Sequence, residues 1–231
     1  MRWPRFPRQR TPGAGDGHAR DRARMVAEQL EARGIRDAEL LRAFGAVERH
    51  RFVEGGEPYG DHALPVGEGQ TISQPYVVAV MTATARPTNG WNGANVLEVG
   101  TGSGYQAALL AEMGANVTSI ERHEPLAETA QQRLTQAGYE DRVEVVVGDG
   151  TQGWPAGAPY RSILVTAGGP SVPQPLLAQL DPDGGRLVIP VGDRAHQYLT
   201  LVVREGDELT TTELEAVVFV PLIGEHGYRA D

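Results

Sequence analysis

Short apolar runs alternate with segments of helical periodicity through most of the chain. The runs have the length of buried strands, and most are followed by glycine or an acidic residue. They are residues 96–99, 116–120, 143–147, 161–166 and 184–190. Between them, apolar positions with helical spacing predict helices over 105–113, 123–138 and around 176–180. This alternation predicts an α/β fold with a doubly wound, mostly parallel sheet that binds its ligand at the carboxyl ends of the strands.

The two ends of the chain depart from this pattern. Residues 198–203 and 216–222 flank a glycine-containing turn and predict an antiparallel hairpin at the C-terminal edge of the sheet. Near the other end, helices are predicted over 23–32, closed by Gly34, and after an N-cap at Asp37. The fold is therefore expected to carry an N-terminal helical appendage.

The first residues also differ in composition. Met1 to Arg24 holds seven arginines and two aspartates among prolines and glycines, so residues 1–22 are predicted to form a disordered basic tail. The remainder, 23–231, has the length of one domain and divides into an N-terminal part, 23–90, and a core, 91–231. Because the tail lacks the apolar region of a secretory signal, a cytoplasmic protein is expected.

Charge and composition argue against several classes of protein. The net charge of −9 disfavours general nucleic-acid binding by the folded body, and no apolar run approaches the ~20 residues of a membrane helix. The absence of cysteine excludes disulfides and thiolate metal sites. The six histidines show no close ligand spacing, so no metal site is expected.

A glycine-rich turn follows the first apolar strand. Gly100, Gly102 and Gly104 stand at alternate positions before the predicted helix, and Glu98 precedes them by two residues. The spacing is one residue tighter than that of the dinucleotide fingerprint, which cradles a pyrophosphate. A carboxylate at this strand end suits a ligand with an amino group and no phosphate. The alternative is an ordinary strand-to-helix turn, which three glycines in five residues make less favourable.

Acidic residues follow the next two strands. Glu121 comes 17 residues after Gly104, at the end of the second strand, where doubly wound folds bind ribose hydroxyls. Asp149 follows the third strand and could accept a hydrogen bond from an adenine amino group or form an Asx-turn. His50 is a weaker candidate for catalysis, since two flanking arginines indicate a surface position.

A polar, glycine-punctuated loop over 64–76 runs into an apolar helix. Ser73 is the expected N-cap of that helix, and Pro75 falls within its first turn. A helix N-terminus with an exposed hydroxyl is also a suitable site for a carboxylate.

Glu98 and the three glycines resemble motif I of the S-adenosylmethionine-dependent methyltransferases. Taken with the loop over 67–75 and the stretches 165–167 and 184–192, the chain resembles the protein-L-isoaspartate O-methyltransferase family from about Met25 to Tyr228. The loop over 67–75 is the discriminating piece, because general methyltransferases lack it. The resemblance implies a class I methyltransferase fold in which 23–90 carries the substrate loop and 91–231 binds the cofactor.

The resemblance also implies the site residues. Ser73 is expected to be the catalytic residue, and S-adenosylmethionine the cofactor, with S-adenosylhomocysteine as product. The residues implied in cofactor binding are Glu98, Gly100, Gly102, Gly104, Glu121, Asp149 and Gly150. Those implied in substrate binding are Ile72, Gln74, Val165, Thr166 and Ala167.

The implied reaction transfers a methyl group to the free carboxylate of L-isoaspartyl residues in damaged proteins and peptides and so initiates their repair. Methyl transfer from a sulfonium is an in-line displacement, and a carboxylate of pKa ~4 is already ionised at neutral pH, so no general base is needed. Ser73 would orient the carboxylate together with backbone N–H groups. A monomer without nucleic-acid or membrane partners is expected.

Two departures from the family pattern lie near the expected substrate side, at Gly168 and Pro58, and bear on peptide preference. Three rival functions remain open. A methyltransferase for small molecules or nucleic acids would be supported by an Asn/Asp-Pro-Pro-Tyr loop, which 165–168 is not. A nucleotide-dependent oxidoreductase would need wider glycine spacing, and a non-catalytic adaptor would keep the fold and only bind damaged proteins.

Overall fold

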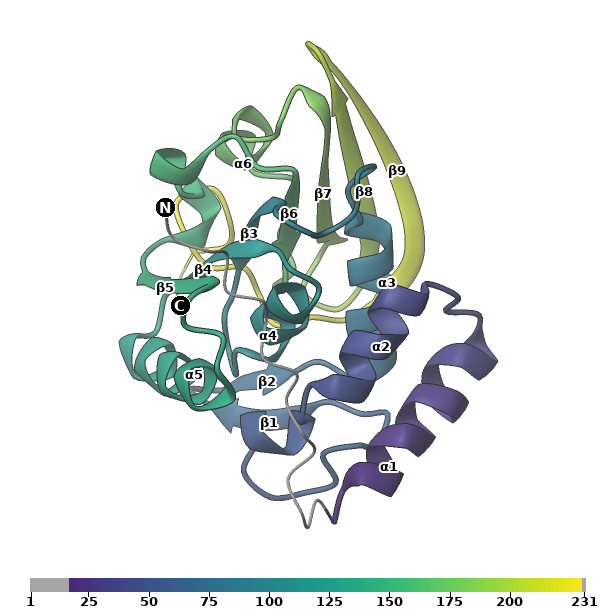
Figure 1. The fold of residues 1–231 in the computed structure, drawn as a ribbon. Coiled ribbons are helices and arrows are strands. Elements are labelled where there is room, and N and C mark those ends of the chain that lie inside the picture. Colours follow the sequence, from purple (N-terminus) through teal and green to yellow (C-terminus); the bar gives the residue numbers. More distant parts are fainter. Residues whose placement is uncertain (1–16, 230–231) are drawn as a thin grey trace, which may run out of the picture.

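A computed structural model of the chain describes residues 17–229. Its centre is a seven-stranded sheet in the order β5-β4-β3-β6-β7-β8-β9 (Figure 1). The strands from β5 to β7 in this order run parallel, and β8 and β9 are antiparallel to their neighbours. The bounds are β3 Asn95–Val99, β4 Asn116–Glu121, β5 Val143–Val147, β6 Ser162–Val165, β7 Asp183–Gly192, β8 Gln197–Glu205 and β9 Glu208–Val217. The predicted doubly wound, mostly parallel sheet is confirmed.

Successive residues of the parallel strands enter two hydrophobic cores on opposite faces of the sheet. Val96, Leu164 and Val188 belong to one core, which also holds side chains of the larger helices. Their neighbours in sequence, including Leu97 and Ile163, belong to the other core, with Leu176 of α6. Burial on both faces explains why these strands read as continuous apolar runs.

Helices cover both faces of the sheet. The first face carries α3 (Pro75–Ala85), α4 (Tyr105–Glu112) and α5 (Glu124–Ala137), while the short α6 (Gln174–Ala178) packs on the second (Figure 1). Gly138 closes α5 in the left-handed conformation, as its place in the sequence predicts.

The N-terminal helices pack outside α3 and α4. Helix α1 (Ala19–Arg24) continues without a break through a π-helical and a 3-10 segment to Arg33, and the left-handed Gly34 ends it. Helix α2 (Ala38–Ala46) follows, and the Asp37 carboxylate caps it by accepting from the N–H groups of Glu39 and Leu40. The predicted helical appendage and both of these helix signals are confirmed.

The predicted boundary of the basic tail is wrong. Residues 19–22 were assigned to it, but they form most of α1. The Arg22 guanidinium donates from Nε to the Gly45 carbonyl oxygen at 2.8 Å, so this arginine ties α1 to the end of α2. Composition alone does not reveal such a tertiary contact. Residues 1–16, the rest of the predicted tail, lie outside the described part of the chain.

The C-terminal hairpin is present, but its second strand was misplaced. It is β9, Glu208–Val217, and not residues 216–222. β9 lies at the edge of the sheet and its side chains are exposed as far as Ala216, so it lacks the apolar pattern that marks the other strands. The apolar residues 218–222 instead cross to the carboxyl ends of the parallel strands.

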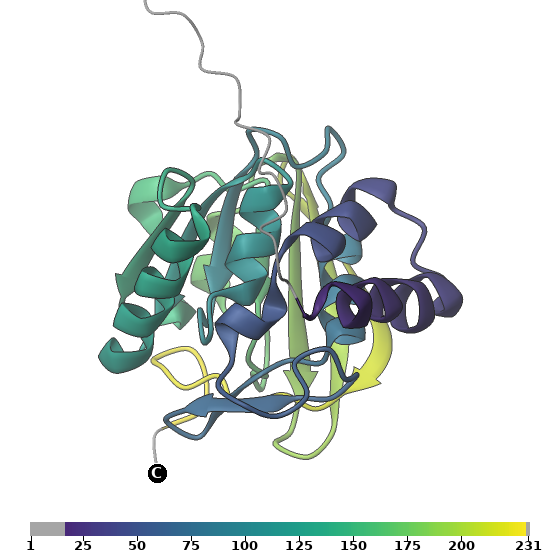
Figure 2. The same ribbon diagram turned by 60° about the horizontal axis from the view of Figure 1, so that its bottom comes forward.

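The loop over 64–76 contains a second, small sheet. β1 (Leu64–Gly67) and β2 (Gln70–Ile72) pair antiparallel, a hairpin that the sequence interpretation treated as loop. Figure 2 shows this hairpin beside the C-terminal segment, at the end of the main sheet toward which its parallel strands point. Two segments far apart in sequence thus cover the edge where a ligand is expected.

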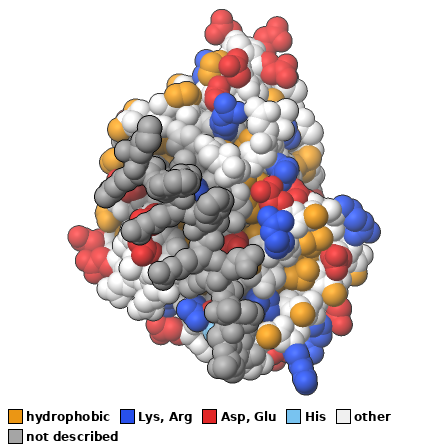
Figure 3. Space-filling model, viewed as in Figure 1, with side chains coloured by type: hydrophobic (Ala, Val, Ile, Leu, Met, Phe, Trp, Pro, Cys, Tyr) orange, Lys and Arg blue, Asp and Glu red, His pale blue; other side chains and the backbone are white. Residues whose placement is uncertain are grey.

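The surface carries its charge unevenly. Acidic side chains gather at the tip of the β8–β9 hairpin, where Glu205, Asp207 and Glu208 are exposed (Figure 3). Between residues 17 and 229, no helix has the length and apolarity that a membrane span requires. Nor does that stretch bring together three His, Asp or Glu side chains able to hold a metal ion.

Candidate active site

Two cavities open at the carboxyl ends of the parallel strands. The first cavity lies where β3, β4 and β6 end, and Glu98, Gly100, Gly102, Glu121 and Thr166 are among its lining residues. The second cavity lies between the start of α3 and the segment 215–220. The structure therefore brings together most of the predicted site residues at one edge of the sheet.

Glu98 is one of the residues that line the first cavity, and it is fully buried. The Ser119 hydroxyl donates to its Oε2 at 2.5 Å, and Oε1 has no hydrogen-bond partner within residues 17–229. Burial raises the pKa of Glu98 to about 8; the Ser119 hydrogen bond opposes this shift and the nearby Glu121 charge adds to it. A buried carboxyl group with an unpaired oxygen is a natural acceptor for a cationic amino group.

Glu121 is held at the end of β4 by two backbone donors. Its Oε2 accepts from the Gly102 N–H at 2.9 Å and its Oε1 from the His123 N–H at 3.0 Å. The residue is 4% exposed and lines the first cavity, so its carboxylate is fixed in place before any ligand arrives. Each oxygen keeps a second lone pair with which to accept from a hydroxyl.

The three glycines of the motif have different surroundings. Gly102 has a φ of +52°, and a Cβ there would meet nothing within 4 Å, so its backbone is bare toward the cavity. Gly104 begins α4 and does not line the cavity. A Cβ on Gly104 would come within 3.5 Å of Leu134 and Ala130 on α5. The structure therefore indicates a packing role for Gly104.

Asp149 is not among the residues that line the first cavity, although its neighbour Gly150 is. Its Oδ1 accepts from the Thr151 N–H at 2.9 Å, the Asx-turn that the sequence left open. Its Oδ2 accepts from the Glu225 N–H at 2.8 Å, which ties the C-terminal segment to this strand end. Burial raises the pKa of this carboxyl, but the hydrogen bonds to Glu225 and Thr151 outweigh it and lower the pKa overall.

The predicted N-cap role of Ser73 is wrong. Helix α3 begins at Pro75, its N-cap is Gln74, and no side chain caps it. Pro75 at the first helical position has no N–H, and the Val78 N–H is satisfied by the Gln74 carbonyl oxygen at 3.2 Å. Within the described part of the chain the Ser73 hydroxyl has no hydrogen-bond partner, so it is available to a ligand.

Four residues line both cavities: Thr71, Ser73, Thr166 and Val220. They form what we call the shared rim. Thr166 is fixed there because its Oγ1 lies 2.7 Å from the Gly100 carbonyl oxygen and 3.1 Å from that of Val99. The two cavities therefore adjoin at this rim, where a group bound in one can meet a group bound in the other.

The structure places the remaining predicted substrate residues in three different surroundings: the first cavity, the second cavity and the hydrophobic core. Ile72 and Ala167 line the first cavity and Gln74 lines the second. Val165 lines neither, because it is fully buried in the core on the α6 face of the sheet. The family resemblance implies a substrate residue at this position, but alternate residues of a strand point to opposite faces of the sheet.

Arg49 is a residue of this region that sequence reasoning missed. Its guanidinium is fully buried and donates from Nε to the Pro58 carbonyl oxygen at 2.7 Å and from an Nη to the Ser73 carbonyl oxygen at 2.8 Å. Its Cζ also lies 4.9 Å from the ring centre of Tyr105, the first residue of α4. Burial lowers its pKa, with Tyr105, Tyr59 and Asp61 opposing. No pattern in the sequence distinguishes this buried arginine from its neighbour Arg51, which is exposed.

A second missed group is the segment 220–223, all of which lines the first cavity. Residues 220–222 belong to the predicted edge strand 216–222, and residue 223 follows it. These residues reach the glycine-rich turn because the chain crosses after β9 to the carboxyl ends of the parallel strands, and the local pattern of apolar residues does not indicate that path.

The parallel sheet, the glycine-rich turn after β3 and the fixed carboxylate after β4 together define a class I S-adenosylmethionine-dependent methyltransferase. A family model described as Protein-L-isoaspartate(D-aspartate) O-methyltransferase matches residues 21–227. The chain belongs to this family. Family members use S-adenosylmethionine to methylate isoaspartyl residues of damaged proteins, which begins their repair, and the chain is an enzyme of this kind.

Individual relatives agree with this assignment. A protein-L-isoaspartate O-methyltransferase of Methanospirillum hungatei is 50% identical over 214 residues, which cover 91% of this chain and 97% of the relative. One of Pelobacter propionicus is 52% identical over 209 residues, covering 88% and 91%. A solved protein-L-isoaspartate O-methyltransferase superposes with a TM-score of 0.79 at 28% identity, over 89% of this chain and 67% of that one. A Plasmodium falciparum structure with bound S-adenosylhomocysteine has the same fold, with a TM-score of 0.74 at 23% identity over 86% of this chain and 96% of that one.

The residues of the first cavity fit this cofactor. The unpaired Glu98 Oε1 suits an ammonium group, the bare Gly102 backbone leaves room for close approach, and the Glu121 carboxylate can accept from ribose hydroxyls.

Proposed function

We propose that methyl transfer takes place at the shared rim and that Ser73 orients the carboxylate that receives the methyl group. The observation that carries the proposal is that Ser73 borders both cavities with a hydroxyl that helix capping does not use. In this assignment the first cavity holds the cofactor through Glu98, Gly100, Gly102 and Glu121. The second cavity holds the peptide that carries the isoaspartyl residue.

Bound S-adenosylmethionine supplies a methyl group on a sulfonium, which an ionised carboxylate accepts by in-line displacement. The task of the protein is to fix the carboxylate in line, because holding the reacting groups in the right geometry lowers the barrier to such a reaction. Ser73 donates its hydroxyl hydrogen to one carboxylate oxygen and leaves the other free to react. No group of the protein needs to remove a proton, since the carboxylate is ionised at neutral pH.

Discrimination between aspartyl and isoaspartyl residues requires a rim of fixed dimensions. The two differ by one backbone methylene, so the carboxylate stands at a different distance from the peptide chain. Arg49 holds the Ser73 backbone through its carbonyl oxygen, and the Thr166 hydroxyl is bound to the backbone of the glycine-rich turn. Both sides of the rim are therefore anchored to the core of the protein.

The test is a methylation assay with labelled S-adenosylmethionine on three peptides of one sequence. They carry aspartate, isoaspartate, or isoaspartate whose free carboxylate is amidated. Only the second should accept the methyl group. Equal labelling of the aspartyl peptide, or any labelling of the amidated one, would contradict the proposed site chemistry.

We also propose that the enzyme acts as a monomer in the cytoplasm on proteins and peptides, without nucleic-acid or membrane partners. The net charge of −9 disfavours nucleic acid. Light scattering coupled to size-exclusion chromatography should give a mass near 24.8 kDa. A mass of twice that value would overturn the monomer assignment.

A further inference from the structure

The Val220 side of the shared rim is held by Gly168. The Gly168 N–H donates to the Val220 carbonyl oxygen at 2.8 Å, and the Leu222 N–H donates to the Gly168 carbonyl oxygen at 2.7 Å. Residues 220–222 therefore run beside the loop that follows β6. That loop carries Thr166, another rim residue.

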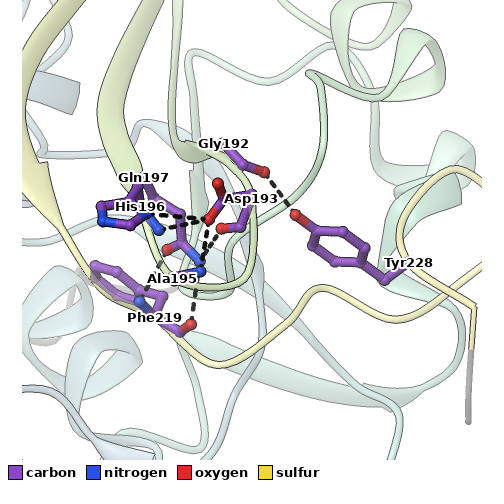
Figure 4. A network of polar contacts seen from close by, with 7 residues as sticks. All are labelled: Gly192, Asp193, Ala195, His196, Gln197, Phe219 and Tyr228. Carbon is purple, nitrogen blue, oxygen red and sulfur yellow. Dashed lines mark hydrogen bonds and ion pairs between the residues drawn. The ribbon is translucent and has the colours of Figure 1, made fainter.

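Gln197, at the start of β8, fixes the preceding residue of the same segment. Its Oε1 accepts from the Phe219 N–H at 2.8 Å, and its Nε2 donates to the Phe219 carbonyl oxygen at 3.3 Å and to the Asp193 carbonyl oxygen at 3.2 Å (Figure 4). Gln197 is 1% exposed, so these bonds form away from bulk water. Asp193 is itself fixed, since its carboxylate accepts from the N–H groups of Ala195 and His196 at 2.7 Å.

Gly168 and Gln197 are in direct contact. A Cβ on Gly168 would lie 2.5–2.6 Å from three atoms of the Gln197 amide, closer than real contacts allow. The backbone at Gly168 does not have a positive φ, so its conformation admits alanine, but an alanine Cβ would displace the Gln197 amide from its present position. The hydrogen-bonded position of the amide thus depends on glycine at residue 168, where the sequence departs from its family's pattern.

We propose that Gln197 is a positioning residue: its amide, lodged against Gly168, holds Phe219 and thereby sets the Val220 side of the shared rim. This inference rests on the proposed function, in which the rim is the place of methyl transfer. It assigns a role to two residues that were not among the predicted site residues, of which Gln197 also lines the second cavity, and it links the glycine at 168 to the glutamine at 197.

The test is a double-mutant cycle with Gly168→Ala, Gln197→Ala and the double variant. Each single variant should lower kcat/KM for an isoaspartyl peptide by about 10- to 100-fold, since a rim displaced by about 1 Å misaligns the reacting groups. Because Gln197→Ala removes the clash, adding Gly168→Ala to it should lower kcat/KM little further. The peptide KM should rise and kcat should fall in protein that circular dichroism shows to be folded at the assay temperature.

Thr200→Val is the matched control. Thr200 lies on the same strand, is buried, and its hydroxyl donates to the Tyr198 carbonyl oxygen at 3.1 Å. Its replacement removes a part-buried hydrogen bond of β8 that involves neither Gln197 nor Phe219, so kcat and KM should stay at wild-type values. If Gln197→Ala does not fold, Gln197→Asn takes its place, because it keeps the amide but withdraws it from Phe219 by one methylene.

Wild-type kcat and KM in the folded Gln197 variants would overturn the inference. It would also be overturned if the losses of kcat/KM in the two single variants multiplied in the double variant, because the two residues would then act independently. Failure of the proposed function is distinguishable, because it would show as full activity of Ser73→Ala. Full activity of the Gln197 variants together with an impaired Ser73→Ala enzyme would reject the positioning role alone.

Discussion

Replacement of Ser73 by alanine should separate catalysis from stability. Since Gln74 occupies the N-cap of α3 and the Ser73 hydroxyl has no partner within the described residues, the change removes no native hydrogen bond that the structure shows. The free energy of unfolding should therefore change by less than about 0.5 kcal/mol. A Ser73 that capped the helix would instead cost about 1 kcal/mol. Urea denaturation of the two proteins measures this difference.

The expected loss of rate follows from the bond that Ser73 is proposed to make. A hydroxyl that donates to a carboxylate contributes roughly 1.5–3 kcal/mol. If this bond orients the carboxylate in the transition state, kcat/KM for an isoaspartyl peptide should fall about 10- to 150-fold. The rate effect would then far exceed anything that the small change in stability could produce.

Two further substitutions at the same position sharpen the test. Ser73→Thr keeps a hydroxyl and should retain part of the activity. Ser73→Asp places a like charge beside the incoming carboxylate and should nearly abolish turnover, while the affinity for S-adenosylhomocysteine, measured by calorimetry, stays close to wild type. An active Ser73→Asp enzyme, or wild-type kcat/KM in Ser73→Ala, would refute the proposed role.

Three other predictions follow from the structure. Burial raises the pKa of Glu98 from 4.5 to about 8, so its contribution to stability is fully present below pH 4.5 and is lost as the pH rises through 8. In urea denaturation without cofactor, the free energy of unfolding of the wild type should fall relative to that of Glu98→Gln as the pH rises from 4.5 to 8. A difference between the two proteins that does not change with pH would contradict the raised pKa of Glu98. Glu121→Ala should weaken S-adenosylmethionine binding by roughly 1.5–3 kcal/mol in calorimetry with the fold intact, and unchanged affinity would remove Glu121 from the site. Deletion of residues 1–16 should leave activity and melting temperature nearly unchanged. Deletion of residues 1–22 should lower the melting temperature, because it removes the hydrogen bond from Arg22 to Gly45. Equal melting temperatures for the two shortened proteins would contradict a stabilising role of this bond.

The elements that the sequence predicts correctly are those that leave a local pattern of residue types along the chain. Strands such as β3 are buried on both faces and appear in the sequence as apolar runs. Gly34 and Gly138 mark the ends of helices, because the backbone there has the left-handed conformation that favours glycine. The positions of Glu98 and Glu121 follow from the same logic, since each lies where a parallel strand ends. Local physics is sufficient for these features.

The features that escape prediction depend on contacts between distant segments. β9 is an edge strand with exposed side chains, so no periodicity marks it. By residue type Ser73 is the better N-cap, yet the helix begins after Gln74, because the path of the chain sets its start. Arg49 belongs to the residue type least expected in a core, and its burial is possible only because two carbonyl groups from other segments meet it there.

The two sides of the shared rim are supported in the same way. On one side the buried guanidinium of Arg49 holds the carbonyl group of Ser73, and on the other the buried amide of Gln197 holds both backbone groups of Phe219, next to Val220. Both supports act on the backbone, and it is backbone spacing that differs between an aspartyl and an isoaspartyl substrate. Side-chain chemistry at the rim cannot separate the two substrates, because each presents an ionised carboxylate. On the proposed mechanism, selectivity therefore resides in the rigidity that these buried polar groups give to the rim, and the hydroxyl of Ser73 supplies the rate.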